Sequence, residues 1–422
     1  MSYYYKGIRC IKCGHEMTLQ EAFDGCPVCR GEESSVNAET YYDFGQDKVE
    51  LAAGFKNAKG FGLWSHKEFL PIKPDSKMIS IGEGHTPLLH AKKLGEHLGL
   101  NNLYLKLECM NPTWSYKDRL CSVGVSRAIQ DGAPVVTVSS TGNHGASVAA
   151  YAAAAGIPCV VFTLSSVPST MKTLMQSYGA YVFATDKATD RWKIMNWCVK
   201  NLGWYPLSGY VSPAMGSNCF GMDGYKTLTF ELFEELGDLP DQIVVPSTYS
   251  DGLYGMWKGV KDLHEIGLSS KPTKMVAAEV FGSLKATLAA GTDEIQNVHA
   301  EDTVSFSIGG GRGTYQGYAA LVQSGGYAEN CPDDEVMPMQ ALLGRTEGVY
   351  AEAASTCPLV AIQKLAAQGK IKADDTVVAV ITSSGLKDPS STAKRMPEVP
   401  VILPESGELS AALSNNYGIK LF

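Results

Sequence analysis

Two groups of residues in the sequence have the types and spacing that chemistry requires. The stretch NPTWSYKDRL, residues 111–120, contains Lys117 between aromatic side chains and hydrogen-bonding groups. A lysine on a helix surface needs no explanation, but a lysine at the mouth of a loop, among apolar rings, has the environment of a nucleophile. Lys117 is therefore the candidate catalytic amine.

Four of the eleven cysteines form the second group, ordered as Cys10-x2-Cys13 and Cys26-x2-Cys29 with twelve residues between the pairs. Two such pairs hold one tetrahedral zinc ion in zinc ribbons. A ribbon that has lost its metal is the alternative. Because four thiolates leave no open coordination position, a zinc ion here would be structural. We expect the ribbon to span residues 1–34, followed by a polar linker.

The bulk composition describes an ordinary globular chain. With 422 residues it is long enough for two or three domains, and 45% of its residues are hydrophobic. The formal net charge of -8 offers no basic surface for nucleic acid or an anionic membrane. The first ten residues lack the apolar core of a signal peptide, so we expect a cytoplasmic protein.

One stretch imitates a membrane span. Residues 145–171 contain no charged side chain and are numerous enough to cross a bilayer. Gly156 and Pro158 interrupt the stretch, and its first half is mostly alanine. We interpret residues 146–155 as a buried helix and residues 159–164 as a buried strand.

The elements that position these groups alternate between short β-branched runs and longer helical patterns. The pattern predicts strands at 135–139, 159–164, 181–184, 243–246, 275–280 and 377–381, and helices at 146–155, 172–178, 191–202, 224–236 and 253–266. Strands that alternate with helices favour a parallel sheet covered on both faces. The chain is therefore predicted to have an α/β fold.

Ligands of such sheets bind at the carboxyl ends of the strands. Four stretches rich in Ser, Thr, Gly and Asn fall there: SSTGNHG (139–145), PSTYSDGLYG (246–255), EAAST (352–356) and TSSGLKD (382–388). Their backbone and hydroxyl groups are suitable donors to an anion. The glycine run GGGRG (309–313) lacks the spacing of a dinucleotide fingerprint and is interpreted as a plain loop.

Taken together, these stretches resemble the fold-type II enzymes of pyridoxal phosphate, most closely their threonine synthase branch. Seven motifs follow the family's order between Ile79 and Pro389: GEGHTPL (82–88), LECMNPTWSYKDR (107–119), SSTGNHGAS (139–147), GYKTLTFEL (224–232), VVPSTYSDGLYGMWKG (244–259), EAAS (352–355) and TSSGLKDP (382–389). The resemblance implies a fold similar to that of the tryptophan synthase β subunit, with two α/β domains and parallel-type sheets. It places a large cofactor domain at 35–120 and 205–422 and a small domain at 121–204.

The resemblance also assigns roles to residues. It implies that pyridoxal phosphate is carried by Lys117 as a Schiff base, and that the freed amine removes the substrate's α-proton. Its cofactor contacts are Asn143 near the ring hydroxyl, Ser247, Thr248, Tyr249, Ser250, Asp251 and Gly252 around the phosphate, and Thr382 at the pyridine nitrogen. The implied substrate contacts are Ser140, Thr141, His144 and Trp114. A neutral hydroxyl at Thr382 suits elimination and replacement better than transamination.

Two departures from the family pattern affect the cofactor site. Trp114 and Tyr116 stand where the family usually has Gly and Phe, and we expect a desolvated pocket lined by these rings to lower the pKa of Lys117. Asp251 would repel the cofactor's phosphate, so we expect it to turn away and cap the following helix.

A third departure concerns the substrate. Gly221 stands where threonine synthases tend to have an arginine that helps to hold the substrate's phosphate, and Ser384 stands where a histidine is usual. Glycine offers no equivalent of an arginine–phosphate contact. Arg119, Lys226 and Arg312 are the candidates to compensate.

These observations predict a lyase of the threonine synthase type. It would act on a small amino acid by α-deprotonation, followed by β- or γ-elimination or replacement. The alternatives are a serine/threonine-type dehydratase or ammonia-lyase, a β-replacement synthase of the cysteate-synthase type and, more distantly, a non-catalytic cofactor-binding sensor. We expect a homodimer that binds neither nucleic acid nor membrane.

Overall fold

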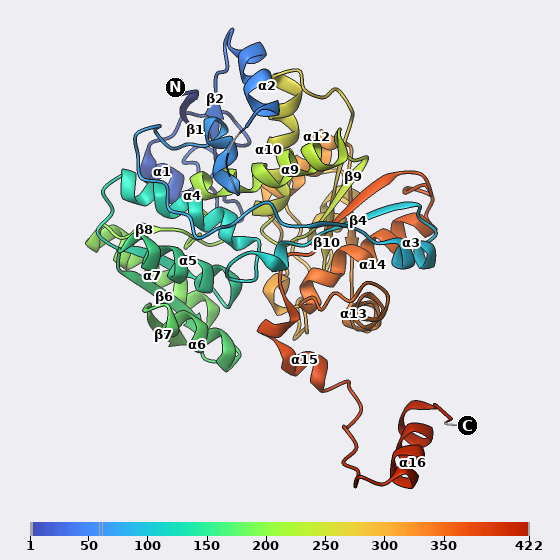
Figure 1. The fold of residues 1–422 in the computed structure, drawn as a ribbon. Coiled ribbons are helices and arrows are strands. Elements are labelled where there is room, and N and C mark those ends of the chain that lie inside the picture. The colour runs from blue at the N-terminus through green and yellow to red at the C-terminus, as the bar shows by residue number, and fades with distance from the viewer. Residues whose placement is uncertain (1–2, 59, 61, 421–422) are drawn as a thin grey trace. The chain divides into compact units, whose positions relative to one another are not determined.

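The computed structural model describes residues 3–58, 60 and 62–420 and contains two α/β sheets and a small N-terminal sheet (Figure 1). Residues 1–387 form one compact unit and residues 388–422 a second one. The predicted division into a large domain at 35–120 and 205–422 and a small domain at 121–204 remains a prediction.

The strands are β1 (Tyr5–Cys10), β2 (Ala38–Tyr42), β3 (Leu88–His90), β4 (Asn102–Lys106), β5 (Val136–Ser139), β6 (Cys159–Leu164), β7 (Tyr181–Thr185), β8 (Tyr205–Pro206), β9 (Gln242–Pro246), β10 (Lys274–Glu279), β11 (Tyr327–Asn330) and β12 (Thr376–Val380). The α-helices are α1 (Leu19–Asp24), α2 (Lys48–Lys56), α3 (Lys92–Leu98), α4 (Lys117–Gln130), α5 (Asn143–Ala155), α6 (Ser169–Ser177), α7 (Ala188–Leu202), α8 (Cys219–Met222), α9 (Lys226–Leu236), α10 (Asp251–Glu265), α11 (Ser283–Ala290), α12 (Tyr315–Ser324), α13 (Asp333–Glu347), α14 (Ala353–Ala367), α15 (Pro389–Ala393) and α16 (Ser406–Tyr417). Short 3-10 helices are η1 (Leu63–Phe69), η2 (Glu108–Met110), η3 (Asp223–Tyr225), η4 (Phe306–Ile308) and η5 (Gly385–Lys387).

The larger sheet has the strand order β11-β10-β9-β12-β4-β3. All neighbouring strands are parallel except β3, which pairs antiparallel with β4 at one edge. The last strand in the chain, β12, therefore lies between β9 and β4. Its hydrophobic run TVVAV is almost wholly buried, as expected of a strand covered on both faces.

The smaller sheet has the order β7-β6-β5-β8 and is parallel throughout. The alanine-rich helix α5 packs against α4, α6 and β6. The uncharged stretch 145–171 is confirmed as a buried helix followed by a buried strand. Among the described residues, no helix is both long enough and apolar enough to pass through a membrane.

The N-terminal ribbon is larger than the sequence predicts. The expected end at residue 34 and the polar linker after it are wrong, because β2 follows and pairs antiparallel with β1. Arg9 of β1 forms an ion pair with Glu39 of β2, with 2.9 Å between Nη2 and Oε1. The ribbon sheet therefore extends to Tyr42.

Candidate active site and metal centre

Lys117 is the first residue of α4, and two networks fix the loop that precedes it. The carboxylate of Asp118 accepts hydrogen bonds from the Thr113 backbone N–H (2.7 Å) and the Ser147 hydroxyl (2.6 Å). The Tyr116 N–H donates to the Thr382 carbonyl (2.9 Å). Burial raises the pKa of Asp118 to about 6, although these hydrogen bonds oppose the shift. Hydrogen bonds thus connect the loop that precedes Lys117 with α5 and with the loop after β12.

The surroundings of Lys117 differ from the predicted pocket. Its Nζ lies 5.0 Å from the ring centroid of Tyr116 and 5.9 Å from that of Tyr225. Trp114 is 45% exposed and does not shield the amine as predicted. Burial lowers the pKa of Lys117, but the nearby Tyr116 and Asp251 outweigh it, so the pKa is raised. The predicted lowering is wrong because the sequence did not indicate that Asp251 lies near the amine.

Asn143, the first residue of α5, lies at the centre of a charged cluster. Its Oδ1 accepts hydrogen bonds from Lys387 Nζ (2.8 Å) and Ser383 Oγ (3.2 Å), and its Nδ2 donates to Glu352 Oε2 (2.8 Å). Burial lowers the pKa of Lys387 to about 8, and the negative charges of Asp118 and Glu352 oppose the shift. Sequence reasoning missed Lys387 and Glu352, although both lie within motifs that it had identified.

The residues predicted to receive the substrate carboxylate lie around the N-terminus of α5. Ser140 and Thr141 are half-buried, whereas His144 is buried. Burial lowers the pKa of His144 well below its ordinary value, and the charge of Lys117 adds to the effect. The imidazole is therefore neutral, and its buried Nε2 has no hydrogen-bond partner among the described residues. An unsatisfied nitrogen at a helix N-terminus is suitable for a bound carboxylate.

The predicted phosphate loop, Ser247–Gly252, runs from the end of β9 into the first turn of α10. Its hydroxyl groups at Ser247, Thr248 and Ser250 donate to the backbone carbonyls of Val245, Ile308 and Thr248 respectively. The amides in the first turn of α10 have no partner within the helix, which leaves them available to an anion. The loop can therefore bind phosphate through its backbone rather than through its hydroxyl groups.

The Asp251 carboxylate is bound by residues outside this loop, and it does not cap α10. Its Oδ1 accepts from the Ser217 N–H (2.8 Å) and Gln316 Nε2 (2.7 Å), and its Oδ2 accepts from the Ser217 hydroxyl (2.7 Å). The N-cap residue is Ser250, which makes no side-chain capping bond. The predicted cap is wrong because residues distant in sequence satisfy the carboxylate.

Thr382 follows β12, and its hydroxyl lies 2.8 Å from that of Ser355. Both residues are buried. A neutral hydroxyl pair is thus present where the sequence predicts the contact to the pyridine nitrogen.

The donor set suits pyridoxal phosphate. Lys117 provides the amine, the N-terminus of α10 provides amides for a phosphate, and Thr382 provides a neutral hydroxyl. Two buried side-chain atoms near Asn143 and Lys117, Glu352 Oε1 and His144 Nε2, have no hydrogen-bond partner among the described residues. Buried polar atoms are rarely left unsatisfied, so these atoms indicate a ligand-binding site.

The four ribbon cysteines suit a zinc ion. Their sulfur atoms all lie within 4.8 Å of one another, with 3.8 Å between Cys10 and Cys29 and 3.7 Å between Cys13 and Cys26. A tetrahedral site with Zn–S bonds of about 2.3 Å requires sulfur separations of about 3.8 Å. The geometry therefore agrees with the four-thiolate site predicted from the spacing.

The three cations proposed to compensate for Gly221 are all engaged elsewhere. Arg119 is fully buried between two carboxylates, Lys226 forms a buried ion pair, and Arg312 bonds to a side-chain amide and a backbone carbonyl. The partners are Glu108 and Glu231 for Arg119, Asp262 for Lys226, and Asn297 and Glu33 for Arg312. None of the three is positioned as a free cation for a substrate.

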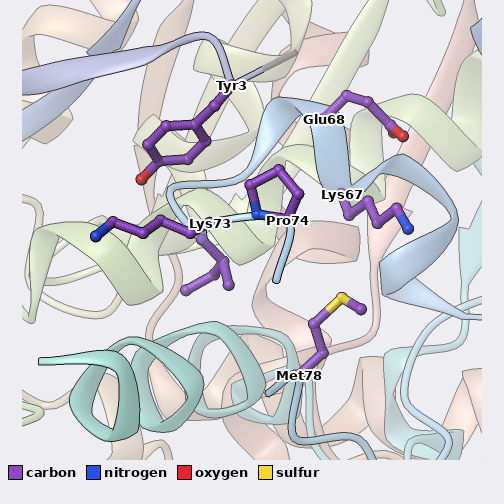
Figure 2. A pocket seen from close by; sticks show the side chains of 7 residues that line it. Tyr3, Lys67, Glu68, Lys73, Pro74 and Met78 are labelled. Carbon is purple, nitrogen blue, oxygen red and sulfur yellow. The ribbon is translucent and has the colours of Figure 1, made fainter. Parts of the chain in front are cut away.

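A separate small cavity lies away from these residues (Figure 2). Its lining residues are Tyr3, Lys67, Glu68, Ile72, Lys73, Pro74 and Met78. None of them belongs to the predicted site.

Comparison with known proteins agrees with the site's chemistry. The family described as "Pyridoxal-phosphate dependent enzyme" matches residues 79–383. The threonine synthase of Methanocaldococcus jannaschii is 34% identical, over 93% of this chain and 95% of that protein. The threonine synthase of Methanosarcina acetivorans is 30% identical, over 91% and 93% respectively.

Solved structures share the fold at lower identity. Maize serine racemase superposes with a TM-score of 0.63 and 17% identity, over 82% of this chain and 96% of that chain. The processed form of threonine deaminase isoform 2 from Solanum lycopersicum gives 0.61 and 17%, over 74% and 84%. These similarities confirm the predicted fold class.

Proposed function

Because the chain belongs to the family of pyridoxal-phosphate-dependent enzymes, in its threonine synthase branch, we propose that it converts O-phosphohomoserine and water into threonine and inorganic phosphate. The bond between the substrate's Cγ and its phosphate oxygen breaks, and the released phosphate takes up a proton. Cβ loses one proton and gains the hydroxyl group of water, while Cγ gains a proton and becomes a methyl group. The observation that carries the proposal is the 34% identity to a threonine synthase over almost the whole length of both chains.

Some residues of the site bind the cofactor or the substrate, and Lys117 transfers the proton. When bound, the cofactor supplies an electron sink for the carbanion formed at the substrate's Cα. Lys117 Nζ is the base that takes the α-proton. Its raised pKa favours the protonated amine, which can return the proton to the substrate. The first-turn amides of α10 hold the cofactor's phosphate, and Ser140, Thr141 and His144 receive the substrate carboxylate.

Arg191 is a cation available for the substrate's phosphate. It lies on α7 and is only 8% exposed, yet no carboxylate of the described residues forms an ion pair with it. Within the part of the chain that the structure describes, its guanidinium forms one hydrogen bond, from Nε to the Ala188 carbonyl at 3.4 Å. Because burying a charge without a partner is costly, an anionic ligand would account for its position.

The surroundings of Arg191 support this role. Burial lowers its pKa, and the neighbouring Tyr249, in the phosphate loop, opposes the shift. Met195 lies one helical turn after Arg191, and its sulfur accepts from the Ser208 hydroxyl, which in turn accepts from the Ser139 N–H. Arg191 thus belongs to the part of α7 near both the end of β5 and the phosphate loop. We therefore assign to it the contact that Gly221 cannot make.

The assay that tests this function measures phosphate and threonine together. The purified holoenzyme is incubated with O-phosphohomoserine, and we expect equal amounts of both products. Lys117→Ala is the control, and its turnover should fall by about 10²- to 10⁴-fold. Absence of both products, with 2-oxo acid and ammonia released from serine or threonine, would favour a dehydratase or ammonia-lyase instead.

We also propose that the active protein is a homodimer in the cytoplasm. Light scattering of the purified holoenzyme measures its molar mass, and twice the chain mass of 45.3 kDa is expected. A monomer would contradict the proposal.

A further inference from the structure

The metal centre of the ribbon is hydrogen-bonded to one short backbone segment. The N–H of Ile11, which lies between Cys10 and Cys13, donates to the Asn37 carbonyl (3.2 Å), and the Cys26 N–H donates to the Val36 carbonyl (3.0 Å). Both pairs of cysteines therefore set the position of the residues just before β2. A change at the metal centre can therefore act on this segment directly.

The Asn37 side chain connects that segment with the rest of the protein. It is only 2% exposed, and its Nδ2 donates to Gln316 Oε1 (3.0 Å) and to the Ser217 carbonyl (3.0 Å). Its Oδ1 accepts from the Ala38 N–H (2.9 Å). Both Nδ2 and Oδ1 of Asn37 thus have hydrogen-bond partners, which fixes the orientation of the side-chain amide.

Gln316, near the start of α12, continues the connection to the cofactor loop. It is fully buried, and its Nε2 donates to Asp251 Oδ1 (2.7 Å) and to the Tyr249 carbonyl (2.5 Å). The Ser217 hydroxyl and N–H bind the same Asp251 carboxylate. Asn37 therefore contacts both residues that hold Asp251.

These groups are closely packed around Gly216. Gly216 has a φ of +113°, and a Cβ there would clash with Gln316 and approach Asp251 Oδ1 to 2.7 Å and Asn37 Nδ2 to 3.0 Å. Only glycine combines this backbone conformation with the required space. A shift of Asn37 would consequently be transmitted to Gln316 and Asp251.

The series of contacts that starts at the ribbon ends at Asp251, which lies near the catalytic Lys117. Its charge is one of the causes of the raised Lys117 pKa. The next residue, Gly252, lies so close to Tyr116 that a Cβ would come within 2.6 Å of the ring. The position of Asp251 is therefore coupled both to the charge near Lys117 and to the loop that binds the cofactor's phosphate.

We propose that Asn37 and Gln316 are positioning residues that couple the four-cysteine metal centre to the cofactor site by holding Asp251 and its loop in place. Zinc bound at the ribbon stabilises this arrangement, and its loss weakens cofactor binding. The coupling rests on the family's cofactor and not on the substrate proposed above, so the two proposals can fail separately.

The test is a measurement of cofactor affinity with and without metal. The zinc-loaded full-length chain, and the same chain treated with a chelator, are titrated with pyridoxal phosphate, and binding is followed by absorbance. We expect metal removal to raise the dissociation constant about tenfold, and cofactor to tighten zinc binding by the same factor because such coupling is reciprocal. A dissociation constant that changes less than about twofold would overturn the proposal.

Two variants distinguish coupling through Asn37 and Gln316 from a general stabilising effect of the ribbon. Asn37→Ala should bind cofactor as weakly with zinc as the wild type does without it, and should respond little to metal removal. Gln316→Met keeps the side-chain length but removes both hydrogen bonds to the loop, and serves if Asn37→Ala does not fold. The proposal fails if either variant, once folded, keeps the full wild-type response to metal.

The matched control breaks another contact between the ribbon and the body. Lys12 of the ribbon forms an ion pair with Asp293 (2.8 Å), beside a cavity of about 420 Å³ that Ser35, Arg312 and Tyr315 also line. Asp293→Asn removes this ion pair and leaves Asn37 and Gln316 unchanged. It should retain the wild-type metal dependence, and loss of that dependence would mean that any ribbon contact suffices.

Discussion

The site contains two lysines whose surroundings act in opposite directions. Lys117 lies near Asp251, which helps to raise its pKa, whereas burial dominates at Lys387 and lowers its pKa to about 8. Without bound cofactor both amines are charged at neutral pH, but Lys387 is the one that can lose its proton under mildly alkaline conditions. The loss of a proton from Lys387 can thus be distinguished from that of Lys117 by varying the pH.

Lys387→Met tests the lowered pKa. Between pH 8 and 10.5, the unfolded chain holds the proton that folded Lys387 has lost, so stability rises with pH over this window. We expect the wild type to gain stability relative to Lys387→Met as the pH rises from 8 to 10, measured by urea unfolding at each pH. Lys93→Met, at an exposed position of α3, should show no such trend. A pH-independent difference would contradict the assignment.

Arg191→Gln tests the proposed phosphate contact. Loss of a charge-assisted contact should raise the KM for O-phosphohomoserine about ten- to hundredfold, with a smaller change in kcat. Arg345→Gln is the control, because exposed Arg345 also donates to a carbonyl of its own helix. An unchanged KM with reduced cofactor content would mean that Arg191 binds the cofactor's phosphate instead.

The sequence predicted those residues of the site that are recognisable from a short motif with fixed spacing. The four cysteines were found from their spacing, and their sulfur atoms do converge. Lys387, Glu352 and Arg191 were missed because their environment depends on residues far away in the sequence. The roles taken from the family for Asn143 and Thr382 remain predictions, although the structure buries both side chains.

At the scale of elements, six strands of the two larger sheets were predicted, whereas others were not, among them the largely buried five-residue β4. Each of the predicted strands and helices has a counterpart in the structure, and β6 has the predicted bounds. The missed β3 and β8 have three and two residues, and the missed β11 has the polar sequence YAEN. Such strands are defined by pairing with a neighbour, a tertiary effect that local sequence does not encode.

The contact between α10 and the lysine loop can be tested with a pair of glycines. Gly252→Ala would place a Cβ 2.6 Å from the Tyr116 ring, and we expect a destabilisation of about 1–3 kcal/mol and weaker cofactor binding. Gly54→Ala in α2 has no atom within 4 Å and should stabilise the protein by about 0.5–1 kcal/mol. Thermal unfolding measures both, and a neutral Gly252→Ala would show that the loop can relax.

At the scale of the whole molecule, the ribbon sheet and the body share a buried charge. Asp223 accepts hydrogen bonds from the side chains of Thr40 and Tyr42 in β2 and from Lys258 in α10. Burial opposes its ionisation, but the neighbouring lysines outweigh burial and lower its pKa. Its stabilising effect is therefore present above its ordinary pKa, near 4, and is lost as the pH falls further.

Asp223→Asn should weaken this junction strongly. The change leaves the Lys258 charge buried without its partner, and we expect a loss of about 3–5 kcal/mol in the free energy of unfolding at pH 7. Asp43→Asn is the control, because the ion pair of Asp43 with Lys6 is exposed and an asparagine oxygen can still accept from the Gly45 N–H, so stability should change by less than about 1 kcal/mol. Similar losses in the two variants would contradict the buried ion pair.

The central place of β12 has a consequence for biosynthesis. A ribosome makes the chain from the N-terminus, so β4 and β9 emerge long before the strand that lies between them. Until residues 376–380 are translated, the larger sheet exists as two unjoined parts. The carbonyl of Thr382, which accepts from the loop of Lys117, emerges still later. The nascent chain therefore cannot assemble its active site before residues 376–382 have been translated.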